Sequence, residues 1–169
     1  MLAIIGAVCI LFHATLISST IVSPSMSPTL QGQSWSDGDR VLTEVVSYWF
    51  RRPRRWEVVT FRRADGMLVM KRVVGLPGET VQLHKNGELF INDQAVPQPA
   101  MLSHLRYIPI GMISEDRAVN CMAGYFVLGD DSKDSDDSRY EGPITATSIV
   151  GRAWLIVGPW SRVGWVNRP

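Results

Sequence analysis

The chain of 169 residues contains only two cysteines and three histidines, and its formal net charge is +1. Cys9 lies in an apolar run and Cys121 lies far downstream, so we expect no structural disulfide between them. Cysteine usage therefore does not identify the redox compartment. The small net charge gives no electrostatic argument for nucleic-acid binding. Helical periodicity is scarce after residue 22, and the chain has no internal repeat.

Charged side chains are absent from residues 2–22. As a helix these 21 residues would cover about 30 Å, the thickness of a bilayer core. We therefore predict one N-terminal transmembrane helix over residues 1–22, followed by a single domain over residues 23–169. A cleaved signal peptide is an alternative, but no basic residue precedes the apolar run and no small-x-small exit precedes Ser23. A buried helix of a soluble protein is the other alternative.

The side of the membrane on which the domain lies does not follow from charge. Four arginines occur in the segment RRPRR at residues 51–55, about 30 residues after the predicted helix, which is too far for the positive-inside rule to apply. We expect RRPRR to be an exposed loop or strand edge. Contact with lipid headgroups is its alternative role.

The rest of the sequence predicts short strands separated by turns. Asn86–Gly87 is a strong hairpin signal, and Ala64–Gly66 forms a second turn. The predicted strands cover residues 40–48, 56–63, 67–74, 81–91 (as a hairpin), 123–128 and 149–157, with an irregular insert at 97–120. The fold class is therefore mainly β, a domain of coiled antiparallel sheets.

Two residues stand out as a chemical pair. Ser25 lies in SPSMSPTL, where the prolines favour a stiff, extended backbone, although a serine in such a segment is most often a linker residue. Lys71 alternates with Val69 and Val73 in a predicted strand, so its ammonium would face apolar neighbours. Burial lowers the pKa of a lysine and makes it a candidate general base. A lysine that reaches solvent from a surface strand is the alternative.

A serine needs an adjacent base to act as a nucleophile. The histidines, His13, His84 and His104, show no setting in the sequence that would orient an imidazole. A serine–lysine dyad of Ser25 and Lys71 is the other known arrangement.

The acidic segment GDDSKDSDDSR, from Gly129, holds five aspartates within residues 130–137. An EF-hand loop would require glycine at its sixth position, where this segment has Ser135, so we predict no metal site. A solvated loop without chemical function is the stronger alternative.

Four blocks of this sequence resemble, in order and spacing, those of the type I signal peptidases (leader peptidases), which are Ser-Lys peptidases of family S26. The blocks are PSMSPTL at 24–30, RWEVVTF at 55–61, KRVVGLPGE at 71–79 and GDDSKDSDDSR at 129–139. The second block has Trp56 and Glu57 where the family usually has glycine and aspartate. The acidic block has Asp131 and Asp134 where asparagine is common, and this added negative charge would raise the pKa of Lys71.

The resemblance implies a membrane-bound serine endopeptidase that removes N-terminal signal peptides from secreted precursors, with no cofactor. Ser25 would be the nucleophile and Lys71 the general base. Ser23 would donate to the oxyanion, Ser135 would orient the lysine, and Asp137 with Arg139 would support the loop. The apolar walls of the substrate pockets would be Met26, Leu30 and Met70.

The partners implied by the resemblance are precursor proteins and the lipid bilayer, with the domain outside the cytoplasmic membrane. Three alternatives stay open. One is a LexA-like self-cleaving regulator, which would need a DNA-binding domain for which no residues remain. The second is an anchored β-domain that binds a protein partner without catalysis, and the altered acidic loop favours it. The third is a peptidase dedicated to one conjugation or organelle substrate.

Overall fold

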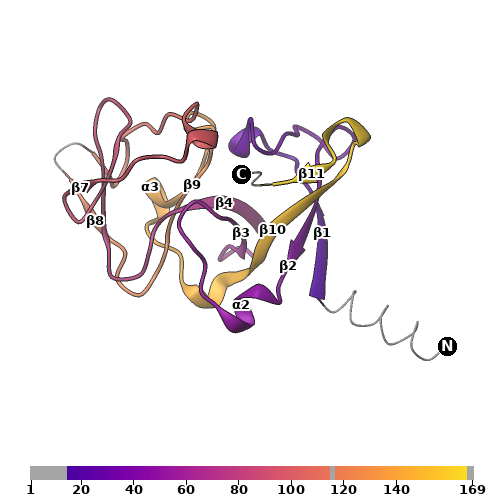
Figure 1. Ribbon diagram of the computed structural model, residues 1–169, viewed down its shortest axis with the longest axis horizontal. Coiled ribbons are helices and arrows are strands. Elements are labelled where there is room, and N and C mark those ends of the chain that lie inside the picture. Colours follow the sequence, from indigo (N-terminus) through magenta and orange to yellow (C-terminus); the bar gives the residue numbers. More distant parts are fainter. Residues whose placement is uncertain (1–14, 115–116, 167–169) are drawn as a thin grey trace.

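Two antiparallel sheets form the framework of the computed structural model, which describes residues 15–114 and 117–166 (Figure 1). The larger sheet has the strand order β1-β2-β10-β3-β4-β9, with β11 also pairing with β10. The smaller sheet has the order β7-β6-β5-β8. The prediction of a mainly β fold with antiparallel sheets is therefore confirmed.

The strands of the larger sheet are β1 (Leu16–Thr20), β2 (Arg40–Glu44), β3 (Val58–Arg62), β4 (Leu68–Gly75), β9 (Phe126–Leu128), β10 (Ile149–Gly158) and β11 (Gly164–Trp165). Those of the smaller sheet are β5 (Thr80–Leu83), β6 (Leu89–Ile91), β7 (Gln94–Ala95) and β8 (Val119–Asn120). The helices are single turns: η1 (Pro24–Met26), α2 (Ser47–Phe50), η2 (Ala100–Leu102), α3 (Ser138–Glu141), η3 (Ala146–Ser148) and η4 (Trp160–Arg162).

Both predicted hairpins form. The β5–β6 turn is closed by the Gly87 N–H donating to the His84 carbonyl, and Gly87 has a φ of 83°, which a glycine adopts without steric cost. The β3–β4 turn is closed by the Arg63 N–H donating to the Met67 carbonyl. Because β3 and β4 are joined by this short turn, Lys71 comes to lie opposite Val59.

The first strand corrects the prediction for the N-terminus. Leu16–Thr20 is not part of a helix but strand β1, which pairs with β2 in the register Ser18↔Leu42. The sequence LISST carries β-branched and hydroxyl side chains, which suit a half-exposed edge strand. Residues 1–14, which hold the rest of the predicted transmembrane helix, lie outside the described residues. Within the part that the structure describes, no helix is long and apolar enough to cross a bilayer.

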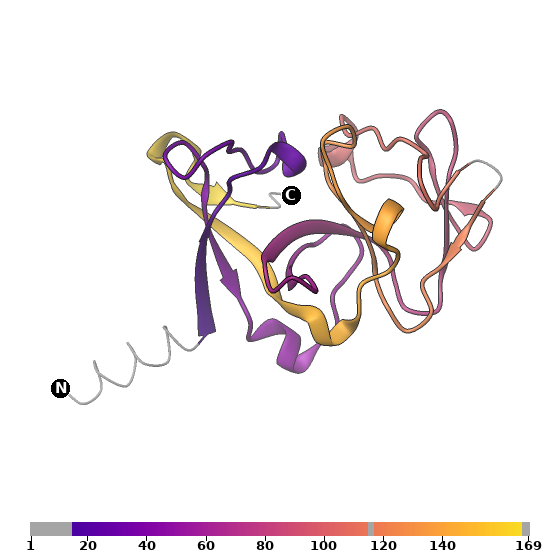
Figure 2. The same cartoon turned by 180° about the vertical axis from the view of Figure 1, so that it is seen from behind.

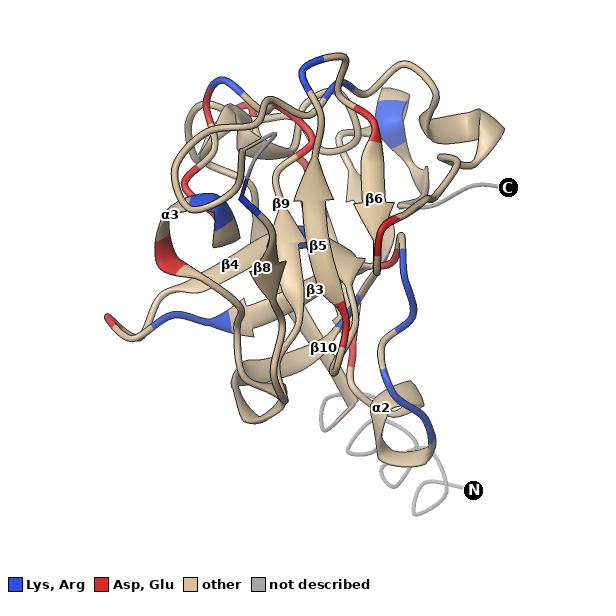
Figure 3. Ribbon diagram, turned by 90° about the vertical axis from the view of Figure 1, so that its left-hand side faces the viewer, with Lys and Arg blue, Asp and Glu red and all other residues tan. Residues whose placement is uncertain are grey.

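The segment RRPRR follows α2 and runs along the molecular surface, where it is the blue stretch next to α2 in Figure 3. Two of its arginines are paired: Arg51 with Glu57 at 2.7 Å and Arg55 with Glu79 at 2.6 Å. Arg52 and Arg54 are exposed. The prediction of a surface segment is confirmed, and its ion pairs fix it to the start of β3 and to the turn before β5.

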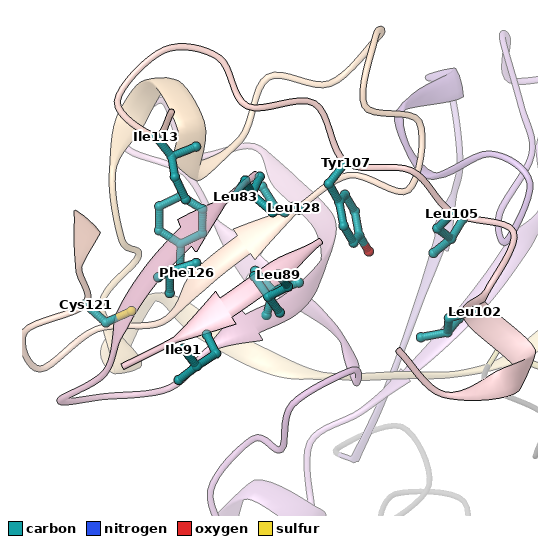
Figure 4. Close-up of a cluster of buried hydrophobic side chains, with 12 residues drawn as sticks. Leu83, Leu89, Ile91, Leu102, Leu105, Tyr107, Ile113, Cys121, Phe126 and Leu128 are labelled. Atoms are coloured by element: carbon teal, nitrogen blue, oxygen red, sulfur yellow. The ribbon is translucent and has the colours of Figure 1, made fainter. Parts of the chain in front are cut away.

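The smaller sheet has its own apolar core. Buried side chains from β5, β6 and β9 meet others from the irregular insert, and Figure 4 shows them converging between the sheet and the insert. Members of this cluster include Leu83, Leu89, Leu105, Ile113 and Phe126. The insert is therefore irregular in backbone but ordered by packing, which covers one face of the small sheet.

The larger sheet is covered on both faces, since two separate apolar clusters use alternate residues of the same strands. Val58 and Met70 belong to the cluster that also contains Met26 and Leu30, while Val59 belongs to the other. The η1 segment thus packs onto the larger sheet through its buried side chains. Because Met26 and Met70 share this cluster, the segment that carries Ser25 lies next to β4. Figures 1 and 2 show the chain from the front and from behind.

Trp56 has an unusual backbone for a large residue. Its φ is 72°, in the left-handed region that favours glycine, and it stands where the resemblance to signal peptidases places a glycine. Its N–H donates to the Val73 carbonyl and its own carbonyl accepts from Arg72 Nη1 at 2.7 Å, which hold the conformation in place. Its side chain packs against the core of the small sheet.

We predict that Trp56→Gly unfolds at higher denaturant concentration than Trp56→Ala. Both variants lose the same indole packing, but alanine pays about 1–2 kcal/mol for a left-handed backbone and glycine does not. At an ordinary position the order is the reverse, with alanine more stable by about 0.4–1 kcal/mol. Urea unfolding of the two variants, followed by near-UV circular dichroism, measures the difference. An alanine variant as stable as the glycine variant would contradict a constraint at this φ.

Candidate active site

Ser25 lies in the single turn η1, directly after β1. The Ser23 hydroxyl oxygen caps this turn by accepting from the Ser25 N–H at 3.2 Å, and Pro24 occupies the first helical position. The Ser25 carbonyl accepts from the Asp131 N–H at 3.1 Å. The segment that carries Ser25 is thus tied to the loop after β9, although more than 100 residues separate them in the sequence.

Lys71 is buried in β4, with only 2% of its surface exposed. It lies opposite Val59 in the β3–β4 register and shares a face with Val69 and Val73, as the alternation of the strand predicts. The surface-lysine alternative is therefore wrong. The amine reaches the loop after β9, where Nζ donates to Ser135 Oγ at 2.9 Å.

The loop after β9 holds a buried chain of polar groups behind the lysine. Ser135 Oγ donates to Asp137 Oδ2 at 2.7 Å, and Asp137 binds Arg139 through both of its carboxylate oxygens at 2.8 and 2.9 Å. The Gly129 N–H also donates to Asp137 at 2.9 Å. The side chains of Asp137 and Arg139 are both fully buried. Since every charge in this pair is matched, the loop is held rigidly around Ser135.

The direction of these hydrogen bonds decides what the lysine can do. A serine hydroxyl has one proton, and Ser135 donates its proton to Asp137. Its oxygen is therefore left to accept from Lys71, so a neutral Lys71 would keep its lone pair free for another proton donor. The Ser135–Asp137 arrangement orients the amine without consuming its basicity.

Burial lowers the pKa of Lys71 from its ordinary value of 10.5 to about 8. The negative charges of Asp137, Asp136 and Asp130 raise the pKa, and that of Arg139 lowers it, but removal from water outweighs them. The expectation that acidic residues of this loop oppose a neutral lysine has the correct sign. The aspartates that raise this pKa are Asp137, Asp136 and Asp130, whereas the sequence singled out Asp131 and Asp134.

Ser25 and Lys71 line the same cavity, which has a volume of about 290 Å³. One wall is the end of β1 and the following Ile21–Ser23, and the opposite wall is residues 67–71 of β4 and its turn. The side chains of Arg63, Asp134 and Asp136 complete it. The structure thus brings together the two residues that the sequence pairs, in a groove between two stretches of extended chain.

Only two of the three residues predicted to form the walls of the substrate pockets line the cavity. Met26 and Met70 line the cavity, while Leu30 is fully buried in the apolar cluster beneath them. The described histidines are elsewhere: His84 stacks on Phe90 with ring centroids 3.9 Å apart, and His104 lines a separate cavity. Neither is placed to act on Ser25, and His13 lies outside the described residues.

Sequence reasoning missed the second buried ion pair. Arg72 Nε and Nη2 bind the two carboxylate oxygens of Asp130 at 2.7 and 2.6 Å, and neither side chain is exposed. The two residues meet because β9 pairs with β4 at Leu128↔Arg72 and Asp130 follows two residues later, and no local pattern in the sequence indicates that pairing. Ser132 was also missed. Its hydroxyl oxygen accepts from Arg139 and from the Ile108 N–H, linking the loop to the insert.

Metal binding has no support in the geometry of the acidic loop. Asp130 and Asp137 are each committed to a guanidinium, and no group of three histidine, cysteine or acidic side chains converges within residues 15–114 and 117–166. The calcium alternative therefore has no site among the described residues.

Comparison with known proteins gives the family. The family model described as "Signal peptidase, peptidase S26" matches residues 1–160 of this chain. The chain belongs to the signal peptidase family. It is therefore a peptidase, and the resemblance seen in its sequence blocks is confirmed.

Two relatives that are similar in sequence agree with this assignment. Signal peptidase I V of Bacillus subtilis is 34% identical over 148 residues, which cover 82% of this chain and 84% of that protein. Probable signal peptidase I-2 of Synechocystis is 32% identical over 153 residues, covering 85% of this chain and 64% of that protein. A crystal structure of a signal peptidase I from Enterococcus faecalis is 30% identical, covers 60% of this chain and 97% of that one, and has a TM-score of 0.48.

Gly129→Ala tests how tightly the site is assembled. A Cβ at this position would lie less than 3.0 Å from both Ser135 Oγ and the Ser25 carbonyl oxygen, so one of them must move. We predict a loss of about 1–3 kcal/mol in the free energy of unfolding, typical of overpacking. We also predict a fall in peptidase activity of at least about 100-fold, because small misplacements of catalytic groups are costly. A folded variant with wild-type activity would show that these segments tolerate separation.

Proposed function

We propose that this signal peptidase removes N-terminal signal peptides from secreted precursors, using Ser25 as the nucleophile and Lys71 as the general base. The observation that carries the proposal is the buried amine of Lys71, which lines the same cavity as Ser25 and has a lowered pKa. With a pKa of about 8 instead of 10.5, the neutral fraction at pH 7 rises about 300-fold.

In the first step, neutral Lys71 accepts the proton of Ser25 as Oγ attacks the carbonyl carbon of the scissile peptide. The resulting ammonium of Lys71 gives a proton to the leaving amine, and an acyl-enzyme on Ser25 remains. Lys71, neutral again, takes a proton from the water that attacks the ester carbonyl, and the ammonium then gives a proton to the departing Ser25 oxygen. Ser135 keeps the amine aimed throughout, because its hydroxyl is held by Asp137.

The oxyanion of the tetrahedral intermediate would be met by two donors at η1. These are the Ser25 N–H and the Ser23 hydroxyl, which in the free enzyme contact each other at 3.2 Å. A substrate oxygen would replace Ser23 Oγ as the acceptor of the Ser25 N–H hydrogen bond. The Ser23 hydroxyl would then rotate and donate its own proton to the same oxygen. Loss of one such donor costs about 10²–10³ in rate in a serine protease.

The groove suits extended peptides of varied sequence. β9 pairs with β4 only from Arg72 onward, so the edge of Leu68–Lys71 on that side is open among the described strands. Residues 20–22 face it across the cavity. A precursor strand between them would gain main-chain hydrogen bonds on both sides. The shallow apolar lining of Met26 and Met70 would favour small side chains near the cut.

The membrane completes the proposal. The uncharged residues before β1 are the segment that we propose enters the cytoplasmic membrane, with the peptidase domain on its outer side. Ser25 follows this segment by about ten residues, so the nucleophile would stay near the bilayer surface from which a signal peptide emerges. The partners are then signal-peptide-bearing precursors and the lipid bilayer, and the chemistry uses no cofactor.

Ser25→Ala and Lys71→Ala are each predicted to lower precursor cleavage at least about 10⁴-fold, because a dyad works as a unit. The measurement is cleavage of a radiolabelled precursor by the full chain in detergent, followed by gel electrophoresis. Ser27→Ala, in the same loop, and Lys133→Ala, an exposed lysine, are the matched controls and should retain activity. Normal processing by either dyad variant would sink the proposed mechanism, provided that all four variants unfold at wild-type temperatures.

The pH dependence of cleavage provides a separate prediction. Only neutral Lys71 can accept the proton, so kcat/KM should rise with pH and level off above a midpoint near 8. The rate at pH 6 should be about a hundredth of the plateau. A profile that is flat between pH 5 and 9, or one whose midpoint lies near the ordinary lysine value of 10.5, would argue against a buried lysine base.

A further inference from the structure

Arg63 occupies a position beside the groove to which none of the family sequence blocks points. It follows β3 as the first residue of the β3–β4 turn, and it lines the cavity together with Ser25 and Lys71. Its side chain is 32% exposed, so it is neither buried in the core nor free in solvent.

Three carboxylates surround the guanidinium of Arg63. Nη2 lies 3.0 Å from Glu141, Nη1 lies 3.2 Å from Asp136 and Nε lies 3.6 Å from Asp65. Asp65 belongs to the same turn, but Asp136 lies in the loop after β9 and Glu141 is the last residue of α3. The guanidinium therefore joins three segments.

Two of these carboxylates flank the residues that orient Lys71. Asp136 stands between Ser135 and Asp137, and Glu141 ends the helix that Asp137 caps. A single exposed ion pair contributes little to stability, but a guanidinium shared by several carboxylates restrains them as a network. Arg63 thus connects the hairpin that carries Lys71 to the loop that carries Ser135 and Asp137 and to the end of the helix that follows it.

We propose that Arg63 is a positioning residue of this peptidase, which holds the Ser135 loop against the β3–β4 hairpin through its ion pairs with Asp136 and Glu141. The proposal rests on the proposed function, because it assigns Arg63 a role in presenting Lys71 to Ser25. No contact between Arg63 and the reacting atoms is required.

The charges around Lys71 support an electrostatic part of this role. Asp137, Asp136 and Asp130 raise the pKa of Lys71, and Arg139 lowers it. Asp137 is neutralised by Arg139 and Asp130 by Arg72, and the counterion of Asp136 is Arg63. Removal of Arg63 leaves the charge of Asp136 uncompensated, so the pKa of Lys71 should rise.

The test is a series of pH–rate profiles on the full chain. Arg63→Gln should move the rising limb of kcat/KM to higher pH by a few tenths of a unit, the order expected for a change of charge that water and salt largely screen. It should also lower kcat about three- to tenfold with little change in KM, because the amine is less well aimed. Arg63→Lys keeps the charge and should leave the limb in place.

Asp136→Asn should move the rising limb of kcat/KM to lower pH. The double variant Arg63→Gln/Asp136→Asn should have its midpoint close to that of the wild type. Arg62→Gln is the matched control. Arg62 is the exposed neighbour whose guanidinium donates to the Gly66 carbonyl of the same turn, and its loss should leave the profile nearly unchanged. If Arg63→Gln lowers the unfolding temperature but leaves the limb and kcat at wild-type values, Arg63 serves stability alone and the proposal is overturned.

A second measurement separates this proposal from the proposed function. The chain has three lysines, Lys71, Lys85 and Lys133, so the pH dependence of their acetylation by acetic anhydride can be followed peptide by peptide with mass spectrometry. Arg63→Gln should raise the labelling midpoint of Lys71 and leave that of Lys85 unchanged. This result would hold even if the wild type cleaved no precursor. An unchanged Lys71 midpoint in an active enzyme would overturn the role of Arg63 alone.

Discussion

Removal of the Lys71 amine from water is the constraint on which the site depends. The ammonium form loses hydration in the strand interior, and nearby aspartates restore only part of what it loses. The protein keeps this balance by giving those aspartates other cations. Asp137 is bound by Arg139 and Asp130 by Arg72, each through two hydrogen bonds. The negative charges of Asp130 and Asp137 are thus offset by arginines, and the pKa of Lys71 stays at about 8.

Two adjacent cations on β4 illustrate why lysine and arginine are not interchangeable. Both are buried, on opposite faces of the same strand. Arg72 cannot lose its charge, and besides its full ion pair it donates to Thr29 Oγ1 and to the Trp56 carbonyl. Lys71 has one serine partner, which accepts a hydrogen bond and leaves no formal opposite charge in contact. A guanidinium at position 71 would stay protonated and could not act as a base.

Local patterns in the sequence predicted much of the fold and site. Alternation placed Lys71 among valines, and turn residues located the hairpins at residues 63–67 and 84–88. The errors come from non-local pairing. The apolar run at residues 16–20 fits a helix as well as a strand, and only the pairing of β1 with β2 decides between them. The ion pairs of Arg63 and of Arg72 were invisible, since they join segments 58–78 residues apart through the fold.

The open edges beside the groove have a topological consequence. β1 is the first strand of the larger sheet and β4 the fifth, and residues that continue β1 face the unpaired start of β4 across the cavity. A peptide bound there as a strand would pair with both open edges and close the sheet into a ring, and the ring would last only while the peptide is bound. Each turnover would then end with the ring reopening. The free energy of ring closure would hold the acylated half of the substrate after the amine product has left.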